Sequence, residues 1–371
     1  MQNLDILIIG AGIGGLTAAI VLGRSGHRVC VVEQDPVGGV YGVGIIQQSN
    51  VVRAMASLGL LQDYLHRGFG FDHVDVYSPG GQHLAAVPSH KLVTGQPANV
   101  GIARTALHEI LKQHAAAAGA SIRYGTTFTR LLDDDKGVEV NFTDNSSARF
   151  DIVIGADGVQ SATRACLFPD APSPQFTGQG VWRHNFRRPP ELASLHAYAG
   201  PIGMGLVPLS NELMYLYVTT PEPGNPHYPT AGLAAVMRGK LKNAPPAIAA
   251  LAAQINRDEE VVYRPLKWLL VNGDWHKGRV VLLGDAVHAT TPHLGQGAGM
   301  AIEDAIVLGE ELARASTPQQ AFAAFRARRF ERCRYIVENS RAIGDSQLGL
   351  LPPVDQAKAT GDMFRVVAEP V

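Results

Sequence analysis

The sequence predicts an α/β fold in which a parallel sheet with covering helices is interrupted by a second, β-rich domain and followed by long helices. Residues 4–33 form the pattern of a strand, a glycine turn, a helix and a second strand. Two later passages change to short strands punctuated by Pro and Gly, and strand and long-helix patterns then return. We therefore expect a discontinuous first domain (1–72, 99–172 and 270–345), an inserted domain (73–98 and 173–269) and a C-terminal tail (346–371) whose structure the pattern leaves open.

The opening unit follows from the hydrophobic periodicity. Residues 4–9 predict a buried strand, and the helix after it places Leu16, Ala19 and Ile20 on one face. Gly26 ends this helix, and residues 29–32 predict the second strand. The apolar run 6–9 could also be the core of a signal peptide. It follows an acid, lacks a basic start and continues into glycines, so the strand is favoured.

The remaining elements follow in order along the chain. Asn50 is a candidate cap for a helix that ends at Gly59, and a helical stripe returns at 104–118. The expected strands of the first domain lie at 121–124, 138–142 and 151–154. In the inserted domain we expect strands at 73–77, 181–186, 204–207 and 213–218, a loop at 221–229, and helix at 231–256 broken by Pro245 and Pro246.

Composition excludes several classes of protein. The 371 residues carry a net charge of −1, which argues against a nucleic-acid or anionic-membrane binder. No stretch approaches the roughly 20 apolar residues of a membrane span. Cys30, Cys166 and Cys333 form no CxxC pair, so a reduced, cytoplasmic setting fits best. The 13 histidines show no metal-ligand spacing, so we expect no metal site.

The first functional motif is the glycine turn. Gly10, Gly12 and Gly15 supply G-x-G-x-x-G directly between a strand and a helix, where they allow a tight turn, the approach of a pyrophosphate, and close packing of helix on strand. Glu33 ends the second strand, where a carboxylate would bind ribose hydroxyls. The motif predicts a dinucleotide site, with a simple glycine turn and a surface Glu as the alternative.

Two further motifs follow predicted buried strands. Asp157 and Gly158 come at the carboxyl end of the strand at 151–154, although an Asp-Gly pair is also a common hairpin turn. Asp285 follows the strand at 279–283 and could accept a hydrogen bond from a ribityl hydroxyl. Beyond it stand a rigid turn and a glycine-rich helix start, whose free N–H groups suit the anionic edge of a reduced flavin ring: Pro292, Gly295 and Gly297.

Together the three motifs resemble those of the single-component FAD-dependent aromatic hydroxylases, a group that includes para-hydroxybenzoate and salicylate hydroxylases. The resemblance covers most of residues 1–345 and implies a Rossmann-like FAD-binding domain with an inserted β-sheet substrate domain and C-terminal helices. It implies that Arg104 contacts FAD, with a solvated helix-start arginine as the alternative. It places Val43 and Gly44 in a loop beside the isoalloxazine and Phe128 near the adenine. The basic run 326–334 matches a long helix in this family, whose charged face we expect to be solvated.

The resemblance also implies a reaction. NADH or NADPH would act as a transient co-substrate, since the chain has no second G-x-G-x-x-G. O2 would then add to the reduced flavin to give a C4a-hydroperoxide, whose distal oxygen passes to an electron-rich ring. The alternatives are a related flavoprotein that inserts no oxygen and a non-catalytic flavin-binding redox sensor. We expect a monomer or homodimer.

A pocket for a small aromatic substrate is expected between the β-rich domain and the flavin. His293 could orient or deprotonate a ring hydroxyl, or be a structural histidine. Tyr215 and Tyr217, on one strand face, could do the same or pack in the core. Arg183 could bind a carboxylate or form a surface salt bridge. Other candidate lining residues are Val181, Asn185 and Met204.

The charge of the inserted domain and two differences from the patterns of related enzymes restrict the class of substrate. Residues 173–269 carry nine Lys/Arg against six Asp/Glu, which favours an anionic substrate. Urate hydroxylases typically have Asp where His293 stands, so urate is disfavoured. The Trp-x-Trp-x-Ile-Pro signature of flavin halogenases is absent, which argues against halogenation.

Overall fold

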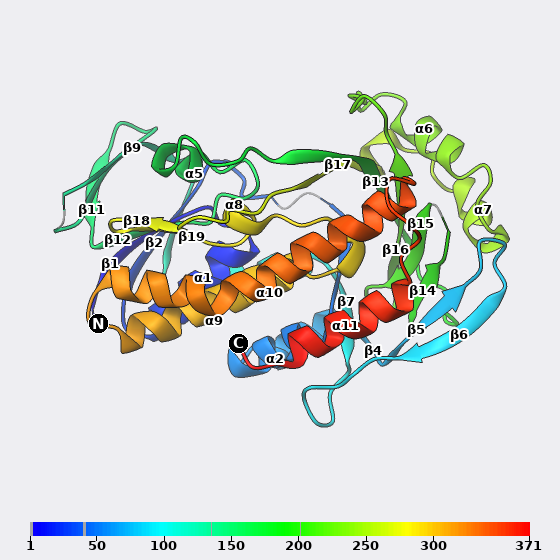
Figure 1. Cartoon of the computed structure of the whole chain (residues 1–371), viewed down its shortest axis with the longest axis horizontal. Helices are drawn as coiled ribbons and strands as arrows, with labels where there is room; N and C mark the ends of the chain where they lie inside the picture. Colours follow the sequence, from blue (N-terminus) through cyan, green and yellow to red (C-terminus); the bar gives the residue numbers. More distant parts are fainter. Residues whose placement is uncertain (1–2, 40–41, 135, 201) are drawn as a thin grey trace.

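The computed structural model describes residues 3–39, 42–134, 136–200 and 202–371. A parallel sheet lies at one end of the elongated molecule and a large antiparallel sheet at the other, and the long helix α10 (Pro318–Gln347) runs between them (Figure 1). This arrangement confirms the predicted mixed fold with C-terminal helices. The domain boundaries drawn from the sequence remain a prediction.

The first sheet has six strands in the order β18-β19-β12-β1-β2-β8, and all its pairings except β18–β19 are parallel. Its strands are β1 (Asp5–Ile9), β2 (Arg28–Glu33), β8 (Ser121–Tyr124), β12 (Ile152–Gly155), β18 (His276–Lys277) and β19 (Val280–Leu282). Helix α1 (Ile13–Arg24) packs against α4 (Arg104–Ala117) and α9 (Gly297–Arg314). Parallel strands buried on both faces account for the apolar runs of the sequence.

The second sheet has seven strands in the order β17-β13-β16-β15-β14-β5-β6, and we call it the antiparallel sheet because every pairing except β14–β5 is antiparallel. They are β5 (His73–Tyr77), β6 (His83–Pro88), β13 (Gln175–Arg187), β14 (Leu195–Tyr198), β15 (Gly203–Pro208), β16 (Leu213–Pro221) and β17 (Val262–Trp268). One face packs in a hydrophobic cluster with α6 (Leu233–Lys240) and α7 (Pro246–Ala252). Because successive side chains of a strand point to opposite faces, every second residue of these strands points to the other face, which is turned toward the first sheet.

Smaller elements connect the two sheets. One three-stranded sheet contains β3 (Gly44–Gln47), β4 (Phe69–Phe71) and β7 (Asn99–Ala103), and another contains β9 (Phe128–Asp133), β10 (Val138–Phe142) and β11 (Ser147–Phe150). The other helices are α2 (Ser49–Ser57), α3 (Leu61–Arg67), α5 (Ala162–Leu167), α8 (Asp285–His288), α11 (Gln356–Ala368) and the 3₁₀ turns η1 (Asp258–Glu260) and η2 (Pro292–Leu294).

Two local expectations are wrong. Asn50 does not cap a helix, because α2 begins at Ser49, after Gln48, and the Asn50 amide donates instead to the side chains of Gln296 and Glu303 at 3.0 Å each. Gly44 is not in a loop, because it begins strand β3. In both cases a tertiary contact, invisible in the local pattern, decides the conformation.

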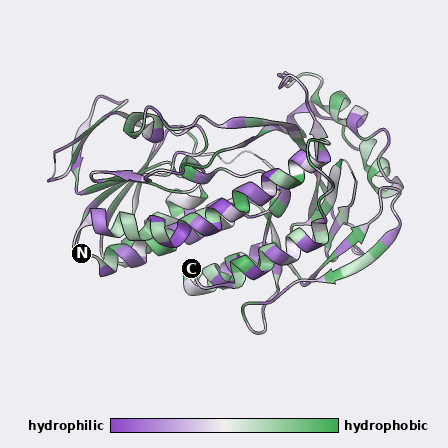
Figure 2. Ribbon diagram, in the orientation of Figure 1, coloured by the Kyte–Doolittle hydropathy of each residue, from purple (hydrophilic) through white to green (hydrophobic). Residues whose placement is uncertain are grey.

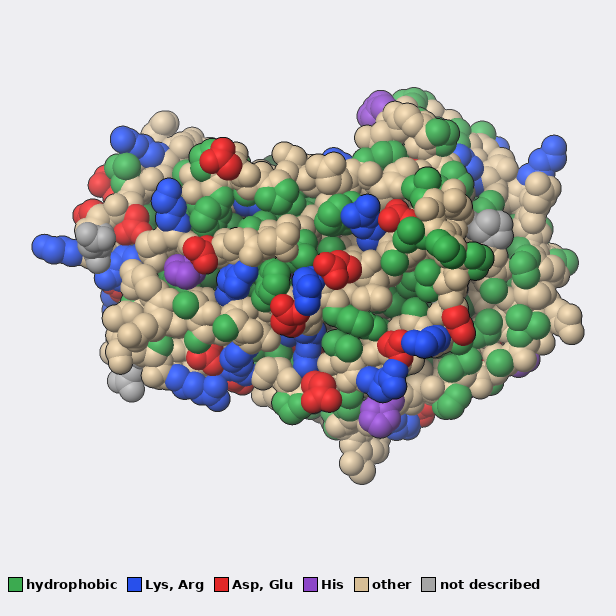
Figure 3. Space-filling model, in the orientation of Figure 1, with side chains coloured by type: hydrophobic (Ala, Val, Ile, Leu, Met, Phe, Trp, Pro, Cys, Tyr) green, Lys and Arg blue, Asp and Glu red, His purple; other side chains and the backbone are tan. Residues whose placement is uncertain are grey.

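The surface agrees with the near-zero net charge. On the face shown in Figure 3, Lys and Arg side chains are interspersed with Asp and Glu. Among the described residues, no helix has both the length and the apolar character that crossing a bilayer requires.

Candidate active site

A cavity of about 640 Å³ lies between the two large sheets. Its walls include the turn after β1, the start of β3, the inner face of the antiparallel sheet, and residues 283–301. The fold thus brings the three predicted cofactor motifs to the same cavity as the predicted substrate residues.

The glycine turn fits a bound pyrophosphate. A Cβ at Gly10, where φ is +107°, would lie 2.5 Å from the Ala156 carbonyl oxygen, and one at Gly15 would lie 2.0 Å from the Gly10 carbonyl oxygen. These two positions therefore need glycine for packing. Gly12 differs, because a Cβ there would meet nothing within 4 Å, and Gly12 lines the cavity. The open space at Gly12 lies at the start of a helix, where anions bind.

Glu33 fixes this turn to strand β2. Its carboxylate accepts hydrogen bonds from the backbone N–H groups of Ala11 and Asp35, each at 2.9 Å. Each oxygen has further lone pairs, so a ribose hydroxyl can still donate to it. The contact with ribose stays a prediction.

Asp157 organises the turn after β12. Its carboxylate accepts from the Ser161 hydroxyl at 2.5 Å and from the Thr163 N–H and hydroxyl at 2.9 Å each. Gly158, with φ of +76°, lines the cavity directly beside it. The Asp157 carboxylate therefore holds the conformation of this loop. Gly158, rather than the Asp157 side chain, faces the cavity.

Asp285 is held at the cavity by a bend in the chain. Gly284 has φ of +63°, and its N–H donates to the Asp304 carboxylate at 2.9 Å. Arg164, on the turn shaped by Asp157, donates to the Ala286 carbonyl at 2.8 Å and so joins the second motif to the third. The Asp285 side chain is open to the cavity, yet the cavity walls displace enough water for desolvation to raise its pKa.

The loop that follows presents backbone to the cavity. Pro292 begins η2, Gly295 is left-handed with φ of +66°, and Gly297 is the first residue of α9. All three line the cavity. Because the first N–H groups of a helix lack intrahelical partners, this end of α9 can stabilise negative charge on a bound ring.

The residues implied by family resemblance divide into two groups. Arg104 and Gly44 line the cavity, and Val43, whose carbonyl accepts from the Arg104 N–H at 3.1 Å, is buried in a small cluster with Tyr215. Phe128 instead packs, partly buried, against the core of the parallel sheet and does not border this cavity. Its predicted place near the adenine has no support from the cavity.

The inner face of the antiparallel sheet carries Arg183, Tyr215 and Tyr217. Strands β13 and β16 place Arg183 opposite Tyr217, and all three residues line the cavity. Burial raises the pKa of both phenols, so they act as hydrogen-bond donors rather than bases at neutral pH. Val181 and Met204 also line the cavity, although Met204 belongs to the hydrophobic cluster behind the sheet as well, and Asn185 does not border the cavity.

Arg183 is the unusual group of this face. Within the described part of the chain its guanidinium has no hydrogen-bond or ion-pair partner. The side chain is partly open to the cavity, but the surrounding walls desolvate it and lower its pKa to about 10. It therefore stays cationic at neutral pH and unpaired, a costly state that an anionic ligand would relieve.

His293 lines the cavity, but both ring nitrogens have protein partners. Nδ1 lies 2.9 Å from the Thr291 hydroxyl and Nε2 lies 3.2 Å from Oε1 of Gln347. Since Gln347 Oε1 also accepts from Gln179 at 2.9 Å, we assign the proton to Nε2. Burial lowers the pKa of His293 to about 4, so the imidazole is neutral and a weak base. No local pattern in the sequence predicts that Gln347 lies beside this histidine.

A buried charged cluster lies behind the cavity. Among the described residues, one group has the spacing of metal ligands: His288, Asp304 and Cys333. Arg329 already occupies this place, because it donates to Asp304 at 2.7 Å and contacts the Cys333 sulfur at 3.7 Å. A guanidinium supplies the positive charge there, so we interpret the group as an ion-pair cluster. The three cysteines are free.

The fold and the glycine-lined cavity define a dinucleotide-binding flavoprotein, and comparison with known proteins identifies the family. Residues 3–340 match the family described as FAD binding domain, and the chain belongs to it. It is 30% identical to the putative FAD-dependent monooxygenase YetM of Bacillus subtilis, over 98% of this chain and 99% of that protein. It is 32% identical to 6-hydroxynicotinate 3-monooxygenase of Bordetella bronchiseptica, over 86% and 85%.

A solved structure agrees in fold. The Klebsiella pneumoniae HpxO complexed with FAD and uric acid superposes with a TM-score of 0.82 at 28% identity, covering 100% of this chain and 94% of that one. The protein is thus an FAD- and NAD(P)H-dependent monooxygenase of the aromatic hydroxylase group, as the resemblance carried by the three motifs implied.

Asp285→Ala is expected to weaken FAD binding. Loss of a hydrogen bond from a charged group costs about 1.5–3 kcal/mol, which is roughly 10- to 150-fold in the dissociation constant. Flavin absorbance per protein and a titration of the flavin-free protein with FAD measure this. Asp274→Ala, an exposed acid on the preceding loop, is the matched control. Full flavin occupancy and unchanged affinity in Asp285→Ala would remove this residue from the cofactor site.

Proposed function

We propose that this enzyme hydroxylates a small aromatic or nitrogen-heteroaromatic substrate that carries a phenolic hydroxyl and an anionic group, using NADH or NADPH and O2. The observation that carries this proposal is the unpaired, partly desolvated guanidinium of Arg183 in the cavity. A planar carboxylate would give it two parallel hydrogen bonds. The names of relatives that act on 6-hydroxynicotinate and 3-hydroxybenzoate support the same class of substrate.

The residues of the cavity then have separate tasks. FAD, when bound, supplies the electron transfer from NAD(P)H and the activation of O2. Arg183 holds the anionic end of the substrate, while Tyr215 and Tyr217 donate hydrogen bonds to its ring substituents.

We propose that His293 positions rather than deprotonates the substrate. Its Nδ1 lone pair accepts from Thr291 and its Nε2–H donates to Gln347, so the ring is fixed in one orientation. With a pKa of about 4 it does not change charge between pH 6 and 8. A hydrogen-bonded imidazole at this place differs from the Asp of urate hydroxylases and continues to disfavour urate.

His293→Ala is expected to lower product formed per NAD(P)H consumed, with the excess appearing as peroxide, while FAD stays bound. A general base contributes about 10²–10⁴-fold, so a positioning residue should lose less than about 10²-fold in kcat. The pH profile between 6 and 8 should keep its shape. A larger loss, together with the disappearance of a titration near pH 4 in kcat/KM, would instead make His293 the base.

A panel of hydroxybenzoates, hydroxypyridines and quinolones tests the proposed function. We expect acidic phenols to accelerate NAD(P)H oxidation and to yield a product heavier by one oxygen atom. Running the panel with NADH and with NADPH identifies the reductant. Acceleration without oxygen insertion would indicate a flavoprotein oxidoreductase of another type, and the absence of any acceleration would contradict the proposal.

A further inference from the structure

The C-terminal helix α11 forms part of the wall of the active-site cavity. Thr360, Met363 and Phe364 line the same cavity as Arg183 and His293. Positions three and four apart share one face of a helix, so the three side chains point the same way. Met363 is fully buried, whereas Thr360 and Phe364 are only partly buried. These two side chains are therefore the part of α11 that a ligand can touch.

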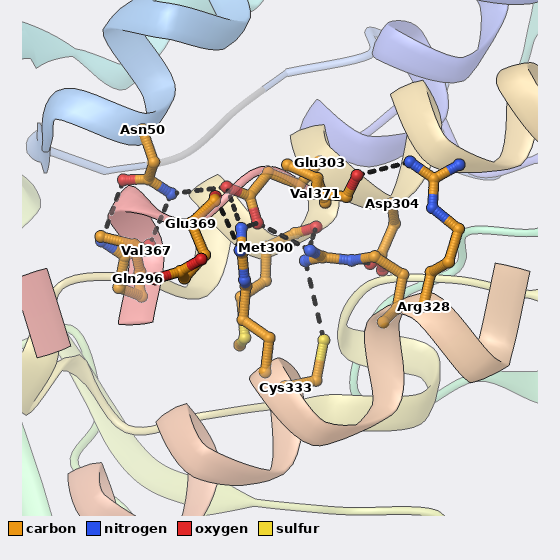
Figure 4. Close-up of polar contacts among 12 residues, drawn as sticks. Asn50, Gln296, Met300, Glu303, Asp304, Arg328, Cys333, Val367, Glu369 and Val371 are labelled. Atoms are coloured by element: carbon orange, nitrogen blue, oxygen red, sulfur yellow. Dashed lines mark hydrogen bonds and ion pairs between the residues drawn. The ribbon is translucent and has the colours of Figure 1, made fainter. Parts of the chain in front are cut away.

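Three arginines of the main body hold the end of this helix. Arg53 donates to the carbonyls of residues 367, 368 and 369 at 2.8–3.1 Å, and Arg332 donates to those of 369 and 370 at 2.8 and 2.9 Å. Arg328 donates to the carbonyl of Val371 (Figure 4). Cations suit a helix C-terminus, where the last carbonyls lack intrahelical partners. We call this set, Arg53, Arg328 and Arg332, the arginine clamp.

The clamp fixes the wall close to Phe364. The first clamped carbonyl belongs to Val367, three residues beyond Phe364 and so within one turn of it. On the preceding turn, the Gln296 amide contacts the Met363 sulfur at 3.5 Å. Gln296 lies between Gly295 and Gly297, which line the cavity at the start of α9. The ion pairs of Asp362 with Lys358 and Arg365 stay within the helix. These contacts hold α11 in place beside the cavity. A side chain can select substrates by size only if its position is fixed in this way.

We propose that Phe364, supported by Thr360, limits the size of the ring system that the cavity accepts. This inference rests on the proposed function and names a specificity-determining residue for it. Phe364→Ala removes one phenyl ring, which is the difference in size between a one-ring and a two-ring aromatic substrate. The wild-type protein therefore favours one-ring acids, and the variant admits a fused second ring.

The test compares a hydroxybenzoate with a hydroxyquinoline carboxylic acid in the wild type, Phe364→Ala and Arg365→Ala. Arg365 is adjacent in sequence but solvent-exposed, so it is the matched control. Since one methylene in an apolar pocket is worth about 10–200-fold, the two-ring over one-ring ratio of kcat/KM should rise by about tenfold or more in Phe364→Ala only. The ratio of dissociation constants, read from the flavin absorbance change, should move in the same direction.

Arg53→Met provides a second variant, because Arg53 contacts carbonyls of the tail and no part of the cavity. We expect faster proteolysis within 348–355 and a selectivity shifted toward that of Phe364→Ala, with FAD retained. Unchanged selectivity in kcat/KM and in binding for folded, FAD-loaded Phe364→Ala would overturn the inference. A wild type whose oxidation of NAD(P)H no aromatic substrate accelerates would instead contradict the proposed function, and the binding ratio would still decide the role of Phe364.

Discussion

Arg329→Met is expected to destabilise the folded protein by about 3–5 kcal/mol, because it removes the central cation of a buried ion-pair network and leaves buried carboxylate oxygens without their hydrogen-bond donor. Arg329 is fully buried on α10 and donates to Asp304 at 2.7 Å and to Glu303 at 2.8 Å, and both acids are buried as well. In the variant, Glu303 would keep Arg332 as its partner, and Asp304 would keep His288, whose Nε2 lies 2.6 Å from the carboxylate.

The same substitution should reach the cofactor. The Asp304 carboxylate accepts from the N–H of Gly284, which holds the bend that aims Asp285 into the cavity. Without the Arg329 donor at Oδ1, the carboxylate would be held from one side only, by His288 at 2.6 Å, and the bend would lose part of its support. We therefore expect FAD to dissociate from Arg329→Met at a lower temperature than from the wild type.

Thermal unfolding followed by circular dichroism and by flavin fluorescence measures both effects. Arg334→Met on the same helix is the control, because Arg334 is exposed and its pair with Glu331 is a surface ion pair, worth about 0–1 kcal/mol. If Arg329→Met melts with the control and releases flavin at the same temperature, the buried pair does not hold this part of the fold.

The burial of this ion-pair cluster could not be predicted from the sequence. The run 326–334 was expected to be a solvated basic face, and that is wrong for Arg329. Figure 2 shows hydrophilic and hydrophobic residues mixed along α10, so the helix pattern does not separate a buried charge from an exposed one. Acidic residues near the start of a helix, such as Glu303 and Asp304, are usually explained by the helix dipole. These two lie beyond the first turn of α9 and serve as buried partners of Arg329.

The parts that were predicted depend on local chemistry. A tight turn between a strand and a helix needs glycine at fixed positions, and these positions lie within six residues of sequence. The motif can therefore be found from the local sequence alone. Strands β9 and β11 were missed because they pair with β10 across short turns and are largely exposed, so they carry little apolar pattern. The role of α11 depends on arginines some 40 to 315 residues away in sequence, which no local pattern contains.

Arg183→Met is expected to lower kcat/KM for an acidic substrate by about 30-fold or more, since truncating one partner of a buried charge pair costs about 2–5 kcal/mol. The effect should fall on KM, and FAD content should be unchanged because Arg183 lies on the antiparallel sheet. Wild-type affinity for the acid should stay constant across the neutral pH range, because the guanidinium keeps its charge there.

A neutral substrate separates charge recognition from simple packing at this position. The carboxamide of the same ring should bind the wild type poorly and should lose little further affinity in Arg183→Met, because it offers no anion to the guanidinium. Arg183→Lys should recover only part of the affinity for the acid, since an ammonium cannot donate two parallel hydrogen bonds to a carboxylate. Equal losses for acid and amide would show that Arg183 shapes the cavity without reading the charge of the substrate, and the anionic class proposed for the substrate would then be wrong.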